Sequence, residues 1–259
     1  MSKRLIESWL PIAEIGIESL RERTPMTPFP APNRLHVWWA RRPLVASRAA
    51  VLASLLPENA DREMFMRVLG IHGDPVACRK RIDEARRKGE RFEGAAYDYK
   101  RAFQYLPSSA EKGWIAEEIG KLGPKRAKCL DPTAGGGSIP FEGLRLELDT
   151  FANDLNPVAA FILRCTVEFP STFGMVLLDE FQRISGYYLK LREERLLPFF
   201  PPEPFENAIP TNFIWARTIT CPYCGGVVPL SPNWRLTPEG IGVRVLPQVG
   251  EGPSTPGRI

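Results

Sequence analysis

Apolar residues recur at helical spacing in the first half of the chain, whereas the second half alternates strand-like and helix-like runs. In the first half, Asp74 is the expected N-cap of a helix whose first residue is Pro75, and Ser108 and Glu111 have the spacing of a capping box. Helices are predicted over 5–23, from Pro43 to Pro57, in the fifties and sixties, over 73–91, and from Ser108 to Gly123.

The spacing of the apolar residues changes at residue 127. Strands are predicted over 127–131 and 149–154, each followed by a helix, over 139–147 and 156–169. A strand–helix–strand–helix series is typical of a parallel sheet with crossover helices, so the predicted fold class is α/β. A long helix over 172–195, a proline-rich connector over 198–211 and a hairpin around two cysteines follow. The predicted organisation is a helical region (1–123), an α/β segment (124–197), the connector (198–211), and a hairpin with a loose tail (212–259).

Composition adds only broad limits. The 259 residues, 44% hydrophobic and 25% charged, are typical of a globular protein. No apolar run is long enough for a membrane span or a secretory leader, so a cytoplasmic protein without a membrane partner is expected. A net charge of +4 permits an anionic partner such as nucleic acid without requiring one. Five cysteines with one close pair favour reduced thiols over a disulfide framework.

The most informative stretch is CLDPTAGGGSIP, residues 129–140. Glycine allows a ligand to touch the backbone, and Pro140 in the first turn of the next helix leaves that helix N-terminus free to face a small anion. The carboxylate of S-adenosylmethionine is such an anion. Asp154 follows Asp131 by 23 residues, about the separation at which an acid binds ribose hydroxyls in these folds. The alternative is a glycine-rich strand-to-helix turn with an incidental acid.

Two motifs together resemble one protein family. DPTAGGGSIPFEGL and NDLNPVAA are similar to the cofactor segment of amino-group DNA methyltransferases, in particular adenine-specific DNA methylases with a zinc ribbon. ESWLPIAEIGIESLRER and LHVWWARRPLVASRAAVLASLLP resemble the domain of unknown function that opens those proteins. The resemblance covers most of residues 1–235. It implies a Rossmann-like fold that uses S-adenosylmethionine to methylate the N6 amine of adenine in DNA, with restriction–modification or phage defence among its roles.

The resemblance also assigns residues. The methionine half of the cofactor would lie against Asp131, Pro132, Thr133, Ala134, Gly135, Gly136, Gly137 and Ser138. Asp154 would bind the ribose, and Asn156 and Pro157 would shape the pocket near the adenine. In LHVWWARRP, Arg41 or Arg42 would pair with the carboxylate, and a tryptophan would pack near the cofactor or a base. The alternative for this tract is that its tryptophans anchor the helical half on the sheet while its arginines lie on the surface.

No catalytic residue is assigned, because the family's catalytic motif is missing. Such methylases carry Asp, Asn or Ser, then two prolines and an aromatic residue that stacks on the flipped base. FFPPEPF has Glu203 where the aromatic belongs, and SPNW has Asn233 in place of the second proline. Both are interpreted as connector sequence. The chain is therefore expected to stop before the catalytic part and to be inactive alone.

CPYCGG has the spacing of a zinc-binding turn with Cys221 and Cys224 as ligands, but it supplies only two of four. The resemblance implies a second pair further along, so partial or no zinc binding is expected. Cys78, Cys129 and Cys165 are predicted to be buried thiols. A basic run over 79–91 is interpreted as a solvated helix face, or alternatively as a surface for DNA phosphates.

Three functions stay open from these residues. The first is a DNA adenine methyltransferase, the second is a methyltransferase that acts on RNA amines, and the third is a module that binds cofactor or nucleic acid without turnover. The first two share the cofactor loop, and the third would bind S-adenosylmethionine without transferring its methyl group.

Overall fold

The computed structural model describes residues 3–24, 30–92, 95–123, 127–200, 213, 215–231 and 233–243. The chain forms two compact units, Met1–Glu180 and Phe181–Ile259. Most of the predicted connector, from residue 201 on, and the predicted loose tail lie outside the described residues. In the described part of the chain, no helix has the length and apolar character needed to cross a membrane.

The first unit begins with the predicted helices, and the residues predicted to cap two of them do so. Its elements are α1 (Leu5–Ser8), α2 (Ile12–Arg23), α3 (Pro32–Leu35), α4 (Leu44–Leu55), α5 (Arg62–Leu69), α6 (Pro75–Lys88), the short 3-10 helix η1 (Ala102–Gln104) and α7 (Ser109–Gly120). Asp74 caps α6 by accepting a hydrogen bond from the Ala77 amide at 2.8 Å, and Ser108 and Glu111 form both bonds of the capping box. The predicted helix over 5–23 is divided in two at Pro11, which lacks a backbone N–H donor.

A βαβ unit follows, and its strands are parallel as predicted. β1 (Lys128–Asp131) pairs with β2 (Asp149–Ala152) in a register that sets Asp131 opposite Ala152. The intervening helix α8 (Ser138–Arg145) packs on one face of this pair. It lies so close to β2 that a Cβ at Gly143 would be 2.7 Å from Thr150 Oγ1. On the other face, Leu130 and Phe151 are paired and are 70% and 54% exposed.

Helical segments complete the first unit and continue into the second. α9 (Pro157–Leu163) continues into a π-helical turn (Arg164–Glu168, η2) and α10 (Phe169–Phe173), and α11 (Val176–Leu196) begins after Gly174. The predicted helices over 156–169 and 172–195 therefore both exist with shifted ends, and the latter begins four residues later than predicted. A 3-10 turn, η3 (Leu197–Phe199), follows α11 in the second unit.

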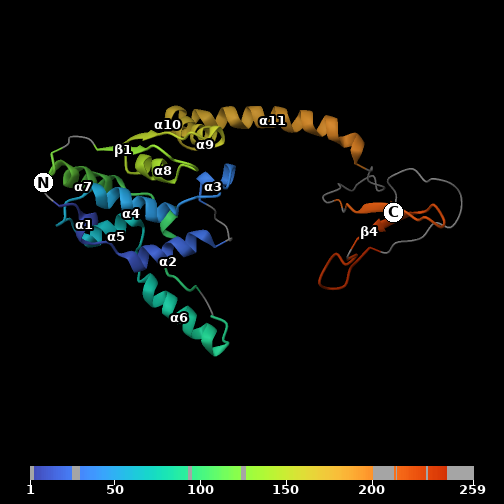
Figure 1. The fold of residues 1–259 in the computed structure, drawn as a ribbon, viewed down its shortest axis with the longest axis horizontal. Coiled ribbons are helices and arrows are strands. Elements are labelled where there is room, and N and C mark those ends of the chain that lie inside the picture. Colours follow the sequence, from blue (N-terminus) through green and yellow to red (C-terminus); the bar gives the residue numbers. More distant parts are fainter. Residues whose placement is uncertain are drawn as a thin grey trace. The chain divides into compact units, whose positions relative to one another are not determined.

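One hydrophobic core joins the helical region to the βαβ unit. α4 lies at its centre, against α1, α2, α5 and α8 (Figure 1). Its apolar residues surround most of the helix, which is typical of a buried helix. The core cluster includes Leu52 and Phe65 from the helical region and Ala127 and Leu148 from the βαβ unit. The two sequence regions thus fold as one structural body.

The second unit contains the predicted hairpin. β3 (Arg217–Thr220) and β4 (Val227–Leu230) are antiparallel, with Thr220 opposite Val227, so the turn between them holds Cys221 and Cys224.

Candidate functional site

The glycine loop leaves β1 at its carboxyl end and leads directly into α8. Gly135 and Gly137 have φ values of 53° and 84°, in the left-handed region that residues with a Cβ rarely adopt. The Ala134 amide donates to the Asn153 carbonyl at 2.9 Å, and the Gly137 amide donates to the Ala134 carbonyl at 2.8 Å. The loop is therefore a tight, internally bonded turn beside the chain that leaves β2.

Two aspartates shape this edge of the sheet, and they act differently. Asp131 is 8% exposed, and its Oδ1 accepts from the Thr133 amide at 3.1 Å. Asp154 lies in the turn after β2, where its Oδ2 accepts from the Gly135 amide and its Oδ1 from the Asn156 amide, both at 2.8 Å. The hydrogen bonds from Asn156 and Gly135 hold the pKa of Asp154 below its usual value. Asp154 is thus an anion that joins the two strand-end turns.

The other predicted residues at this edge have structural contacts. Asn156 caps α9 by accepting from the Val158 amide at 2.9 Å, and Pro157 is the first residue of that helix. Pro132 and Thr133 are exposed, whereas Ala134 is buried. Ser138 does not cap α8; its hydroxyl donates to the Arg42 carbonyl at 2.8 Å instead.

The bare face of the glycine run is occupied by side chains of the protein itself. A Cβ added to Gly135 would lie 2.7 Å from Trp38 Nε1, and one added to Gly136 would lie 2.7 Å from Trp38 Cβ. A Cβ at Gly137 would be 3.0 Å from a Leu163 methyl group. Packing alone thus explains why the loop is so rich in glycine, and the glycines by themselves do not require a ligand.

Backbone amides at the loop are the groups left for an anion. Within the part of the chain that the structure describes, the amide of Gly136 has no hydrogen-bond acceptor, although Gly136 is only partly exposed. The first amides of a helix have no partner inside the helix, and α8 has no side-chain cap. These donors, with the positive end of the helix dipole, are chemically suited to a carboxylate or phosphate.

The residues of the LHVWWARRP tract differ in burial and in what they contact. Trp38 is half-buried and packs on the glycine loop, whereas Trp39 is 87% exposed. Arg42 is exposed, and Arg41 is half-buried near Glu22, whose carboxyl it influences electrostatically. In the described part of the chain, neither guanidinium forms a hydrogen bond or ion pair with the loop, so the carboxylate role of Arg41 stays a prediction. His36 is exposed, with its ring centroid 6.5 Å from that of Trp38.

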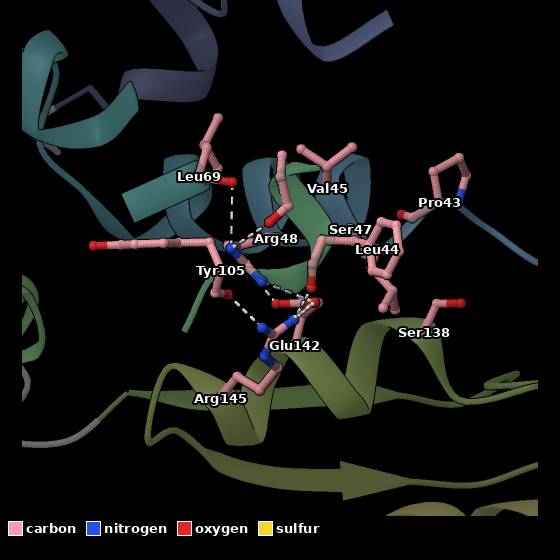
Figure 2. A network of polar contacts seen from close by, with 12 residues as sticks. Pro43, Leu44, Val45, Ser47, Arg48, Leu69, Tyr105, Ser138, Glu142 and Arg145 are labelled. Carbon is pink, nitrogen blue, oxygen red and sulfur yellow. Dashed lines mark hydrogen bonds and ion pairs between the residues drawn. The ribbon is translucent and has the colours of Figure 1, made fainter. Parts of the chain in front are cut away.

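A network of buried charged side chains connects α8 to α4 (Figure 2). Arg48 and Glu142 are both fully buried, with Arg48 Nε 2.6 Å from Glu142 Oε2 and Arg48 Nη2 3.2 Å from Glu142 Oε1. Arg145 Nη1 donates to Glu142 Oε1 at 2.7 Å and to the Phe103 carbonyl at 2.9 Å. Arg145 also donates to the Tyr105 carbonyl. Glu142 thus receives hydrogen bonds from two guanidinium groups.

Arg48 also connects this network to the other helices. Its Nη1 donates to the carbonyls of Val68 and Leu69, at the end of α5, at 3.2 and 3.3 Å, and contacts the Ala102 carbonyl at 3.5 Å. One side chain therefore holds α4, α5, η1 and α8 together. Sequence reasoning missed this residue; the available signal was a single arginine in the apolar run PLVASRAAVLASLLP.

Glu22 is a second buried acid that sequence reasoning missed. It is 6% exposed at the end of α2, and its two carboxylate oxygens accept from the Leu44 amide at 2.9 Å each, at the first residue of α4. Burial raises the pKa of Glu22 to about 7. Hydrogen bonds from Leu44 and Val45 act in the opposite direction, and the nearby Glu142 adds to the rise.

The cysteine pair has the turn of a metal-binding knuckle but too few ligands. The Cys221 amide donates to the Gly226 carbonyl at 2.8 Å, and the Gly225 amide donates to the Cys221 carbonyl at 2.9 Å. Backbone hydrogen bonds from Cys224 and Tyr223 lower the pKa of the Cys221 thiol. No group of three or more metal-binding side chains occurs among the described residues, so these residues do not complete a tetrahedral zinc site.

The three other cysteines only partly follow the prediction of buried thiols. Cys78 is buried, whereas Cys129 and Cys165 are half-buried, and all three are free thiols. Burial raises the pKa of Cys129, and the neighbouring Asp131 adds to that rise.

The basic run lies on α6 and its exit, and α6 projects from the rest of the first unit (Figure 1). Residues 79–91 contain seven Lys or Arg and three Asp or Glu, a net charge of +4, equal to that of the whole chain. The last turn of α6 carries three exposed cations, Arg86, Arg87 and Lys88. Cations at a helix C-terminus are stabilised by the helix dipole, which agrees with a solvated helix face.

Comparison with known proteins finds one family. Residues 9–68 match the model of a protein family of unknown function, DUF1156. No curated protein and no solved structure matches the chain. The matched segment runs from the turn after α1 into α5, so it contains Trp38 and Arg48 but ends before the glycine loop. The N-terminal region that resembled a domain of unknown function therefore matches a family of that kind.

Proposed function

We propose that the chain carries the cofactor-binding part of a Rossmann-like, S-adenosylmethionine-dependent methyltransferase that acts on the N6 amine of adenine in DNA. The observation that supports the proposal is the position of Asp154. Its carboxylate lies 2.8 Å from the Gly135 amide, where two parallel strands end side by side. Ligands of open α/β sheets bind outside the carboxyl ends of such strands, and an acid after the second strand is suited to ribose hydroxyls.

Each part of the cofactor has a chemically matched group. The amide of Gly136 and the N-terminus of α8 would hold the methionine carboxylate. Asp154 uses one lone pair of each oxygen on a backbone amide, which leaves acceptor capacity on both oxygens for the two ribose hydroxyls. Asn156 and Pro157 begin α9 next to Asp154, where they would border the adenine. S-adenosylmethionine, when bound, supplies an electrophilic methyl group.

The target amine has no matched group in this chain. In the family that the chain resembles, the acceptors for this amine and the aromatic ring that stacks on the flipped base belong to the diproline motif, which this sequence lacks. The chain alone is therefore expected to bind the cofactor without transferring its methyl group, and catalysis requires the motif from elsewhere. DNA would contact cationic surfaces such as α6 through its phosphates.

Isothermal titration of the chain with S-adenosylmethionine tests the cofactor proposal. We expect saturable binding to one site, and no methyl transfer when DNA or tRNA is added. Absence of binding at millimolar cofactor would contradict the proposal. Transfer to tRNA but not to DNA by a longer relative that contains the diproline motif would favour the RNA methyltransferase instead.

A non-catalytic binding module is the second candidate. Trp38 and Leu163 favour it, because these side chains of the protein itself lie against the bare faces of the glycines. The same assays repeated on a longer relative that contains the diproline motif distinguish the candidates. Cofactor binding without transfer in that relative would support the module.

The ribose role of Asp154 gives a specific prediction. Asp154→Ala is expected to raise the Kd for S-adenosylmethionine about tenfold to a hundredfold, because hydrogen bonds to an ionised acceptor are lost. Asp149→Asn, at the other end of β2, is the matched control and should leave the Kd unchanged. Titration calorimetry measures both. Unaltered binding by folded Asp154→Ala would exclude a ribose contact.

A further inference from the structure

The segment that carries Trp38, residues 36–43, lies across the glycine loop. It has no helix or strand, and its Val37 and Trp39 side chains are 59% and 87% exposed. The Arg41 amide donates to the Trp38 carbonyl at 3.2 Å, and the Arg42 carbonyl accepts from the Ser138 hydroxyl at 2.8 Å. This segment, in which no residue is fully buried, is thus bonded to the start of α8 and packs one indole on the loop.

Trp38 leaves no room for a side chain at positions 135 and 136, so both residues must be glycine. Gly136 does not have a left-handed φ, so backbone conformation does not explain why it is a glycine. The explanation is Trp38, whose Cβ would be 2.7 Å from a Cβ at Gly136, a separation that real Cβ atoms do not show. Gly135 is held from two directions, by Trp38 on its bare face and by Asp154 at its amide.

This contact has a consequence for the loop amides. The Gly136 amide, which has no acceptor in the described part of the chain, belongs to the residue against Trp38. A loop fixed before binding loses less conformational entropy when a ligand arrives. Trp38 would therefore act on the affinity of the loop for an anion through the position of the loop, without touching the ligand itself.

We propose that Trp38 is a positioning residue of the ligand site. Its indole fixes Gly135 and Gly136 so that the Gly136 amide and the N-terminus of α8 are already placed for the carboxylate of the ligand. This inference rests on the proposed function, because the carboxylate is that of S-adenosylmethionine.

Titration calorimetry with S-adenosylmethionine tests the positioning role. Trp38→Ala is expected to raise the Kd about tenfold, with the loss in the binding entropy, because the loop must then be ordered on binding. Trp38→Phe, which keeps a ring on the same Cβ, should recover most of the affinity. Trp39→Ala removes the neighbouring exposed indole and should bind like the wild type. A role confined to stability would lower the Tm of Trp38→Ala without this entropic loss.

The packing itself is tested by a double-mutant cycle on Tm that uses no ligand. Gly136→Ala is expected to lower the Tm by several degrees in the wild-type background, because the added methyl group overlaps Trp38. Trp38→Gly removes the opposing Cβ, so the same Gly136→Ala change should lower the Tm little in that background. Additive effects of the two substitutions would overturn the proposed contact.

The outcomes separate this inference from the proposed function. If the wild type binds S-adenosylmethionine and folded Trp38→Ala binds equally well, the positioning role is overturned while the cofactor proposal stands. If the wild type does not bind, both are overturned. A raised Kd with entropic loss, recovered in Trp38→Phe and absent in Trp39→Ala, supports the inference.

Discussion

Replacing Arg48 with methionine is expected to lower the free energy of unfolding by about 3–5 kcal/mol, the usual effect of removing one partner of a buried ion pair. Methionine fills a similar volume, so the loss comes from the polar groups left behind. Among the described residues, the fully buried Glu142 then keeps Arg145 as its one charged partner. The carbonyls of Val68 and Leu69, at the end of α5, lose the hydrogen bonds that they accept from the guanidinium. Chemical denaturation monitored by circular dichroism measures the change.

Two further variants test whether the burial of the Arg48–Glu142 pair explains the loss of stability. Arg79→Met removes a pair with Asp83, at 2.9 Å, in which both side chains are more than a third exposed, and is expected to leave the unfolding free energy nearly unchanged. The double variant Arg48→Met with Glu142→Gln should be more stable than the sum of the single changes predicts, because glutamine carries no charge and still accepts from Arg145. Additive single changes would contradict a coupled network.

The unfolding free energy is expected to fall as the pH rises from about 4.5 to about 7, and Glu22 is the reason. Its pKa in the folded chain lies above the ordinary value, so the folded state binds this proton more tightly than the unfolded state does. The contribution of Glu22 is therefore complete below pH 4.5 and is lost as the pH approaches 7. The shift corresponds to a loss of up to about 3 kcal/mol.

Glu22→Gln isolates this contribution. The variant keeps an oxygen that accepts from the Leu44 amide, but it does not titrate. We expect it to lose this part of the pH dependence and to exceed the wild type in stability at about pH 8, with little difference at about pH 4. Glu14→Gln, on the same helix, is the control and should follow the wild type. Parallel pH profiles of Glu22→Gln and the wild type would contradict the assignment.

Local signals in the sequence determined much of the secondary structure. Asp74, with Pro75 after it, and the Ser108–Glu111 capping box act within one helical turn, so the residues that fix the start of each helix are neighbours in the chain. The parallel pairing of β1 and β2 and the closeness of Asp154 to the glycine loop also followed from the sequence. A strand–helix–strand series brings both strand ends to one edge of the sheet.

Only the tertiary structure decided which distant groups meet. Arg48 and Glu142 are 94 residues apart, and Glu22 and Leu44 are 22 apart. Trp38 reaches glycines almost a hundred positions along the chain, and the sequence alone did not show that its indole packs on them. Hydrophobic periodicity shows which face of an element is buried, but it carries no information about which residue lies across that face. The partners of a buried charge or a bare glycine are therefore fixed by the packing of whole helices.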